Sequence, residues 1–318
     1  MVGCCHAWRP DGRRCTQPWR HVHTATGAPG GRTTSARRPR RSQALHGRRR
    51  MRVAALQAEL AGSAAGDLPR VIDQCERAGV ELLVLPECYS GGMPPDKPAA
   101  EAVALSPPYA HLISALRDCP PTMTVVAGFT ELSAGGRLHS SAAVVRAGRL
   151  VGEVTRKLFP REPAFSPGAD LPLYRQEGHA FGVVICNDAN LVEPARLLAL
   201  AGARILACPL NNDLPVEVTR GWAVRTRSTL IARAVENDCW VIAADVSGTA
   251  GGREGGGATR IIAPDGRIVA AAQADEPGLV MADIEVPDRS FLQRWNVAQN
   301  PAVLKQWLDH VSGQRSGT

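Results

Sequence analysis

Residues 181–186 read FGVVIC, and the polar run NDAN follows them directly. An apolar run of this length without polar alternation predicts a strand that is buried on both faces of a sheet. The polar residues after it are typical of a tight turn before a helix. A thiol at such a turn lies near backbone N–H groups and a helix N-terminus, which favour its thiolate form. Cys186 is therefore our candidate nucleophile.

Apolar segments of strand length recur on both sides of this one. They are residues 52–57, 81–86, 124–130, 140–146, 150–157, 205–209, 240–245, 258–263, 267–271 and 278–285. Helices are predicted between them, where apolar residues recur at helical spacing. These cover residues 68–78 with Asp67 as N-cap, residues 109–117, residues 193–201, and a longer stretch that ends near Asn237. Alternating strands and helices predict an α/β protein, with helices covering the sheet, in one domain formed by residues 51–318.

The composition is that of a globular protein without a membrane segment. Of the 318 residues, 44% are hydrophobic, which suits a chain that buries a substantial core. No apolar run approaches the roughly 18 residues that span a membrane. The nine cysteines include no CxxC pair, and no apolar secretory segment stands near the first residue. We therefore expect reduced thiols and a cytoplasmic location.

Residues 1–50 differ in character from the rest of the chain. They hold twelve Arg, no Lys and a single acid, Asp11, whereas from Met51 onward 29 acidic residues face 25 basic ones. This Arg-rich segment lacks apolar periodicity, so we expect it to be disordered. It has three interpretations: a transit peptide, a segment that holds anionic polymers, or a start codon placed too far upstream of Met51, which we favour. The mildly acidic remainder has no nucleic-acid footprint, so we expect no nucleic-acid partner.

Three side chains that can carry chemistry each come at the C-terminal end of a predicted strand. They are Glu87 in VLPEC, Lys157 in VTRKL and Cys186 in VVICN. In α/β sheets, ligand sites gather at the carboxyl ends of the strands. Taken singly, each residue also fits a simpler role, as a solvated loop acid, an exposed strand end or a packed thiol. One shared site accounts for all three together, and we predict that they converge.

Six motifs, in this order, resemble those of the nitrilase superfamily, the carbon–nitrogen hydrolases. They are LVLPE at residues 83–87, GFTE at 128–131, RK at 156–157, REPAFSPG at 161–168, GVVICND at 182–188 and RAVEN at 233–237. The resemblance implies an αββα sandwich that pairs into dimers or larger assemblies. It also implies a small-molecule substrate with an amide-type bond, and it requires neither a metal ion nor an organic cofactor.

The resemblance further implies a Glu–Lys–Cys triad, which is carried over to Glu87, Lys157 and Cys186. Members of this family usually have a second glutamate shortly after the lysine motif. Glu162 occupies that place, at a shorter spacing from Lys157 than is common. We therefore include Glu162 among the candidate catalytic residues, where it would orient Lys157 or the incoming nucleophile.

The chemistry that the resemblance implies is hydrolysis of an amide to a carboxylic acid and ammonia. Glu87 would take the thiol proton as general base, and Cys186 would form a thioester that water then cleaves. Lys157 and the backbone N–H of Asn187 would stabilise the oxyanion. Asp188 is placed with Asn187 in the substrate and oxyanion site, with bracing of the site as its alternative role.

The residues after the cysteine separate branches of the superfamily. True nitrilases typically follow the cysteine with Trp-Glu, whereas this chain has Asn187-Asp188, which favours amides over nitriles. N-carbamoyl amino acid hydrolases share the Cys-Asn-Asp run but place arginines next, where Ala189-Asn190 stand here. We therefore predict an amidase, with an N-carbamoyl amino acid hydrolase or a nitrilase as alternatives. The non-enzymatic alternatives are polyanion binding through residues 1–50 and a catalytically inactive scaffold.

Two further segments carry weaker expectations. The glycine-rich residues 248–257 lack the GK[ST] ending of a phosphate-binding loop, so we expect a mobile loop near the pocket. From about Arg289 onward, the C-terminal tail resembles those that pad a subunit interface in this family.

A shortened chain tests the contribution of the Arg-rich segment. If residues 1–50 only precede the domain, a protein of residues 51–318 should release ammonia from an amide at the rate of the full chain. The two proteins are compared by ammonia release, with circular dichroism to check folding. A shortened protein that folds but has lost activity would show that residues 1–50 take part in function.

Overall fold

Thirteen strands form one hydrogen-bonded network in the computed structural model, which describes residues 49–60, 64–176, 178–286 and 305–306. The segment 1–48, predicted to be disordered, lies outside this description, and so does the predicted interface tail from about residue 289, apart from residues 305–306. Arg49 and Arg50, which were expected to be disordered with residues 1–48, instead begin a paired strand. Within the described residues, no helix is both long enough and apolar enough to cross a membrane.

The network consists of two sheets. The first runs in the order β5 (Arg149–Leu150), β4 (Leu138–Arg146), β3 (Thr124–Leu132), β2 (Leu82–Val84) and β1 (Arg49–Glu59), with β6 (Thr155–Arg156) beside β4 and β16 (Gly278–Val286) beside β1. The second runs in the order β11 (Trp240–Ser247), β9 (Ile205–Pro209), β8 (His179–Val183) and β7 (Leu173–Gln176), with β14 (Arg260–Ile262) beside β11 and β15 (Ile268–Ala271) beside β14.

Strand β1 joins the two sheets. Its residues Val53, Ala54 and Ala55 pair in parallel with β2, whereas its last residues, from Gln57 to Glu59, pair in parallel with β11. Strand β16 pairs antiparallel with β1 along most of the length of β1. A single strand therefore fixes the position of one sheet against the other.

Alternate residues of the central strands enter different hydrophobic cores. In β2, Leu82 and Val84 lie in the core between the two sheets, whereas Leu83 packs on the opposite face. In β9, Ile205 lies in the same middle core and Leu206 in a third core, outside the second sheet. Because side chains alternate between the faces of a strand, an unbroken apolar run is what a strand buried on both faces requires.

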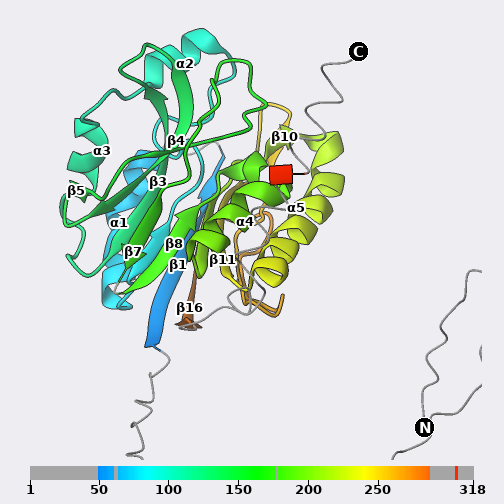
Figure 1. Cartoon of the computed structure of the whole chain (residues 1–318). Helices are drawn as coiled ribbons and strands as arrows, with labels where there is room; N and C mark the ends of the chain where they lie inside the picture. Colours follow the sequence, from blue (N-terminus) through cyan, green and yellow to red (C-terminus); the bar gives the residue numbers. More distant parts are fainter. Residues whose placement is uncertain (1–48, 61–63, 177, 287–304, 307–318) are drawn as a thin grey trace, which may run out of the picture. The chain divides into compact units, whose positions relative to one another are not determined.

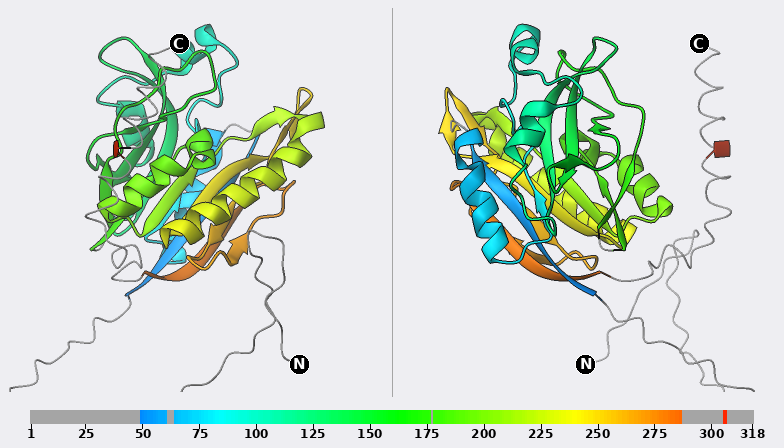
Figure 2. Two further views of the ribbon diagram at one scale, coloured as in Figure 1. Left: turned by 45° about the vertical axis from the view of Figure 1, so that its right-hand side comes forward. Right: turned by 90° about the vertical axis from the view of Figure 1, so that its left-hand side faces the viewer.

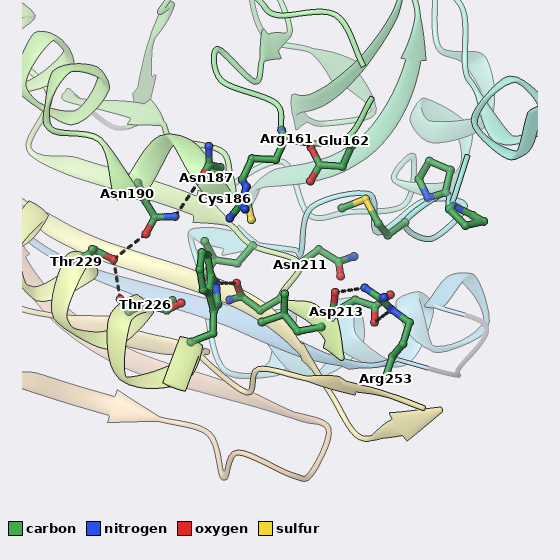
Figure 3. Close-up of a pocket in the computed structure, with 18 of the residues that line it drawn as sticks. Arg161, Glu162, Cys186, Asn187, Asn190, Asn211, Asp213, Thr226, Thr229 and Arg253 are labelled. Carbon is green, nitrogen blue, oxygen red and sulfur yellow. Dashed lines mark hydrogen bonds and ion pairs between the residues drawn. The ribbon is translucent and has the colours of Figure 1, made fainter. Parts of the chain in front are cut away.

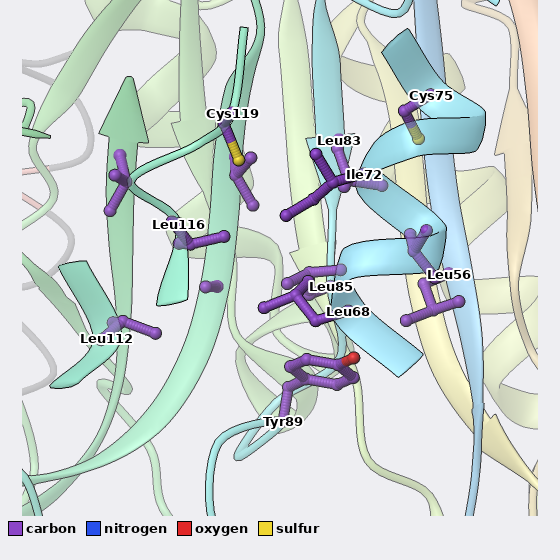
Figure 4. Packing of buried hydrophobic residues seen from close by; sticks show 14 of the residues in the cluster. Leu56, Leu68, Ile72, Cys75, Leu83, Leu85, Tyr89, Leu112, Leu116 and Cys119 are labelled. Carbon is purple, nitrogen blue, oxygen red and sulfur yellow. The ribbon is translucent and has the colours of Figure 1, made fainter. Parts of the chain in front are cut away.

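Helices cover the two outer faces, which gives four layers. Helices α1 (Ala64–Arg77) and α3 (Ala110–Ala115) pack on the first sheet, and Figure 4 shows Leu68, Ile72 and Leu112 entering that core. Helices α4 (Val192–Ala201) and α5 (Val216–Asn237) cover the second sheet, as Figures 1 and 2 show. A shorter helix, α2 (Lys97–Val103), contacts β3. The predicted α/β fold, an αββα sandwich, is confirmed.

Several local boundaries differ from the sequence-based expectation. Helix α1 begins at Ala64, so Asp67 lies in its first turn and is not its N-cap; there its charge still favours the helix dipole. The strand expected over residues 150–157 is split into β5 and β6, because Gly152 between them has a φ of 70° that a strand does not allow.

The glycine-rich segment 248–257, expected as a mobile loop, also differs. It contains β12 (Thr249–Ala250) and β13 (Arg253–Gly255), which form a three-stranded sheet with β10 (Asp213–Pro215). Two of its glycines make the turn between β12 and β13 with positive φ angles. The glycines therefore form the turn of a hairpin. Arg253 on β13 lines a pocket that Cys186 also lines.

Gly128 of β3 lets two backbone segments approach closely. A Cβ atom at this position would lie 2.3 Å from the carbonyl oxygen of Pro86 and 2.7 Å from the Cα atom of Glu87. The turn that follows β2 therefore rests directly on the backbone of β3. Because this turn carries Glu87, the absence of a side chain at Gly128 helps to fix the position of that carboxylate.

The substitution Gly128→Ala should destabilise the protein by about 1–3 kcal/mol, because the added methyl group must push the turn off the strand. The matched control is Gly135→Ala, where a Cβ atom would meet only the Ser133 hydroxyl at 4.0 Å and φ is not positive. Urea unfolding of both variants gives the two free energies. Equal stability of the two variants would contradict the close packing at Gly128.

Candidate active site

Cys186 lies at a sharp turn beyond strand β8. The strand ends at Val183, and Cys186 opens the short 3₁₀ helix η1 (Cys186–Asn190). The expectation that the strand continues as far as Cys186 is therefore wrong, although the buried Val184 and Ile185 still lead into the turn. The φ of Cys186 is 44°, a left-handed conformation that is uncommon for any residue but glycine and that turns the side chain out of the strand direction. The thiol is half-buried.

Lys157 lies next to β6 and is shared by two carboxylates. Its Nζ donates hydrogen bonds to Glu87 Oε1 at 2.9 Å and to the two oxygens of Glu162 at 3.0 and 3.1 Å. The side chains of Lys157 and Glu87 are 1% and 0% exposed. Burial alone lowers the pKa of Lys157, but the charges of Glu87 and Glu162 help to raise it well above its usual value. The ammonium is therefore charged at neutral pH.

The two oxygens of Glu87 have different surroundings. Oε1 accepts hydrogen bonds from Lys157 and from the Ser140 hydroxyl, the latter at 2.6 Å. Oε2 is buried and has no hydrogen-bond partner among the residues that the structure describes. A buried carboxylate oxygen without a partner is costly unless something binds there. Oε2 is thus available to accept a proton.

The pKa of the Cys186 thiol lies well above its usual value. Burial is the main cause, and the charge of Glu87 adds to it. Lys157 and the backbone N–H of Asn211, which hydrogen-bonds the sulfur, act in the opposite direction but do not prevail. The expectation that the turn favours the thiolate is therefore wrong for the resting site. Cys186 is a thiol until a base removes its proton.

Asn187 and Asp188 tie η1 to the residues that follow Lys157. Asp188 is almost fully buried, and its two oxygens accept the backbone N–H groups of Leu158 and Phe159, each at 2.9 Å. Burial raises its pKa to about 6, although the two N–H groups lower it. These contacts give Asp188 the bracing role and no contact with the pocket. Asn187 does line the pocket, and its amide donates to the carbonyl of Phe159 at 2.8 Å.

Asn211 is a site residue that the sequence analysis missed. It follows β9, its backbone N–H reaches the sulfur of Cys186, and its side-chain amide donates to the carbonyl oxygen of Glu87 at 3.0 Å. Its Oδ1 is buried without a partner among the described residues. The signal for it was present, because the polar residues after β9 stand at the carboxyl end of a parallel strand, as do those after β8.

Cys186 opens into a pocket of about 450 Å³, within the range of small-molecule sites. Figure 3 shows Glu162, Cys186 and Asn211 around it. Glu87 and Lys157 are buried and do not line it, but they bind each other and both act electrostatically on Cys186, so the three residues that we predicted to converge lie together in the structure. Over the described ranges, no three His, Cys, Asp or Glu side chains gather as a metal site would need.

The family is shown by comparison with known proteins. The sequence model of the carbon-nitrogen hydrolases matches residues 52–294. The chain belongs to the carbon-nitrogen hydrolase family, and it is an enzyme of the class that cleaves carbon–nitrogen bonds.

Relatives agree with this assignment, and solved structures share the fold. A Pseudomonas protegens protein described as a hydrolase in the pqqF 5′ region is 33% identical over 220 residues, which cover 67% of this chain and 75% of that protein. An (R)-stereoselective amidase of Pseudomonas sp. is 28% identical over 226 residues, covering 68% of this chain and 78% of that protein. A mutant of the Nesterenkonia AN1 amidase, from the nitrilase superfamily, has the same fold with a TM-score of 0.62 at 22% identity, covering 79% of this chain and 96% of that chain.

The raised pKa of Cys186 predicts slow alkylation at neutral pH. Iodoacetamide reacts with the thiolate, so labelling of Cys186 should accelerate as the pH rises from about 6 to about 10. Mass spectrometry of the Cys186 peptide measures the rate at each pH. In Glu87→Gln, which removes a charge that raises this pKa, the curve should move to lower pH. A wild-type rate that is already maximal at the acidic end would contradict the raised pKa.

Proposed function

We propose that this enzyme hydrolyses an amide to a carboxylic acid and ammonia through a thioester on Cys186. The observation that carries the proposal is the arrangement around the sulfur: a buried ammonium and a carboxylate with one unpartnered oxygen act on a single thiol at the edge of a pocket. A nucleophile next to a base that is itself oriented by a third group is the general pattern of nucleophilic catalysis.

In the first half of the reaction, Glu87 Oε2 takes the thiol proton while the sulfur attacks the amide carbon. The electron pair of the C=O bond moves to the oxygen, where the charge of Lys157 and the backbone N–H of Asn187 stabilise it. The N–H groups in the first turn of a helix have no partner within the helix, which makes the Asn187 N–H suited to this. The proton then passes from Glu87 to the nitrogen, the C–N bond breaks, and ammonia leaves. Losing one oxyanion donor typically costs on the order of a hundred-fold or more in rate.

In the second half, water attacks the thioester and gives up a proton to Glu87. The C–S bond breaks, the acid leaves, and the proton returns to the sulfur. Glu162 holds Lys157 through both of its oxygens, so it acts as a positioning residue for the ammonium. Asn211 would orient the substrate through its buried Oδ1, which can accept a hydrogen bond from the amide N–H₂ group.

Amides are the first choice of substrate for two reasons. The Asn187-Asp188 pair after the cysteine is unlike the Trp-Glu of nitrilases. Among the relatives, one is described as an (R)-stereoselective amidase and another as a 2-oxoglutaramate amidase. N-carbamoyl amino acid hydrolysis and nitrile hydrolysis remain the alternatives, and a screen of all three substrate types decides among them.

We also propose that the protein self-associates. Large apolar side chains are exposed on the outer helices, among them Leu197 of α4 and Val224 and Val235 of α5. Such side chains, gathered on one layer, are typical of an interface between subunits. The cytoplasmic location predicted from the cysteines stays a prediction; the six cysteines from Cys75 to Cys239 are all free thiols.

Replacing the nucleophile tests the mechanism. Cys186→Ala should abolish ammonia release, a loss of roughly ten-thousand-fold or more, while the fold survives. Cys75→Ala, which removes a buried thiol on the far helix α1, serves as control and should keep its activity.

Ammonia release is measured over aliphatic, aromatic and carbamoyl amides and over nitriles. Mass spectrometry of the wild-type protein during turnover should detect an acyl adduct on Cys186. Wild-type turnover by Cys186→Ala would refute the assignment. Turnover of nitriles or carbamoyl compounds alone would replace the proposed amide substrate with one of the two alternatives.

A further inference from the structure

Arg161 is a charged side chain of the pocket for which the reaction above has no use. It lies exposed at the pocket mouth, and Figure 3 shows it pointing into the space next to Cys186. The other charged residues of the lining are paired: Glu162 with Lys157, and Asp213 with Arg253. Within the described residues, no carboxylate lies within 4.0 Å of the Arg161 guanidinium.

Arg161 and its neighbour Glu162 contact different parts of the site. The carboxylate of Glu162 turns to Lys157 and also accepts the backbone N–H of Arg161 at 3.0 Å. The Arg161 side chain makes no ion pair with that cluster within the described residues; it lines the pocket, and Figure 3 shows it directed toward Cys186.

The guanidinium is held in place by an aromatic ring. Its central carbon lies 5.3 Å from the ring centroid of Trp222 on α5, within the range of a cation–π contact. The indole N–H of Trp222 donates to Asn212 Oδ1 at 3.1 Å, and Asn212 is bound in turn by the buried Asp245. A stacked guanidinium keeps the N–H groups at its edge free for a bidentate contact with a carboxylate. Arg161 is therefore positioned before any ligand arrives.

The charges of the site give a substrate its orientation. At the bottom, the two carboxylates of Glu87 and Glu162 share the single ammonium of Lys157, so an anion is repelled there. At the mouth, Arg161 attracts one. A second guanidinium, that of Arg225, lies 5.0 Å from the same Trp222 ring but does not line the pocket. A substrate with a neutral amide at one end and a carboxylate at the other matches this layout.

We propose that Arg161 binds a carboxylate of the substrate, and that the substrates of this enzyme are monoamides of aliphatic dicarboxylic acids. The amide carbon lies at Cys186 and the carboxylate at Arg161. This inference rests on the amide hydrolysis proposed above and specifies its substrate class. Arg161 then determines specificity and takes no part in the bond-breaking steps.

The wild-type enzyme is tested first with three amides of equal length and different charge. They are the monoamide of glutaric acid, pentanamide and 5-aminopentanamide. The kcat/KM of the carboxylate should exceed that of the neutral amide roughly tenfold or more, as expected for a charge-assisted hydrogen bond, and the cationic amide should be the poorest. The monoamides of succinic and adipic acid then define the length that spans the pocket.

Variants of Arg161 and Arg225, the two arginines that contact the Trp222 ring, show which of them causes the preference for the carboxylate. Arg161→Gln should remove the preference for the carboxylate, chiefly by raising KM for the monoamide of glutaric acid, with a much smaller effect on pentanamide. Arg161→Lys should restore part of the preference, because it keeps the charge and loses the bidentate geometry. Arg225→Gln is the matched control, since it removes a cation from the same ring outside the pocket, and it should keep the preference.

Two results would overturn the inference while leaving the proposed function intact. One is equal kcat/KM for the carboxylate and the neutral amide in the wild-type enzyme. The other is an equal loss of kcat/KM on both substrates in Arg161→Gln, which would indicate that Arg161 holds Glu162 in position and does not bind the carboxylate. A wild-type enzyme that forms no acyl adduct on Cys186 with any compound of the wider substrate screen would instead overturn the proposed function itself.

Discussion

One buried ammonium held between two carboxylates is the interaction on which the rest of the site depends. Taking Lys157 out of water costs several kcal/mol, which only close contacts with good geometry can offset. Glu87 and Glu162 supply those contacts at 2.9 to 3.1 Å. The same arrangement leaves Glu87 with one oxygen committed and one open, next to a thiol that burial keeps protonated. The base, oxyanion partner and nucleophile that we propose thus belong to a single electrostatic cluster.

The sandwich stabilises this cluster because its parts stand on rigid elements. Lys157 directly follows β6 and Cys186 opens η1, whereas Glu87 lies in the turn after β2. Asp188 adds a second constraint by binding the two amides after Lys157, which prevents that segment from moving away from η1. Gly128 adds a third, since the Glu87 turn rests on its bare backbone. Side chains held in this way need little rearrangement during the reaction.

Much of the fold and the positions of the three candidate catalytic residues could be predicted from the sequence, because each is marked by a short stretch of neighbouring residues. Apolar runs of four to six residues marked the central strands, and Glu87, Lys157 and Cys186 stood at their ends. The short strand β7 and helix α2 were missed, since neither has a clear period of its own. The partners Ser140 and Asn211 and the direction of the Cys186 pKa could not be derived, because they depend on which distant segments pack against the site. The contact between Arg161 and Trp222 could not be derived either, because it joins the segment after Lys157 to helix α5.

The pairing of β1 with β16 has a consequence for synthesis of the chain. Arg52 of β1 and Asp283 of β16 bind each other through two hydrogen bonds, although 231 residues separate them. During translation, β1 leaves the ribosome long before its antiparallel partner exists, so one row of its backbone groups stays open until β16 has been synthesised. Such an exposed edge can pair with another nascent chain. The β1–β16 pairing therefore exposes the unfinished chain to aggregation for most of its synthesis.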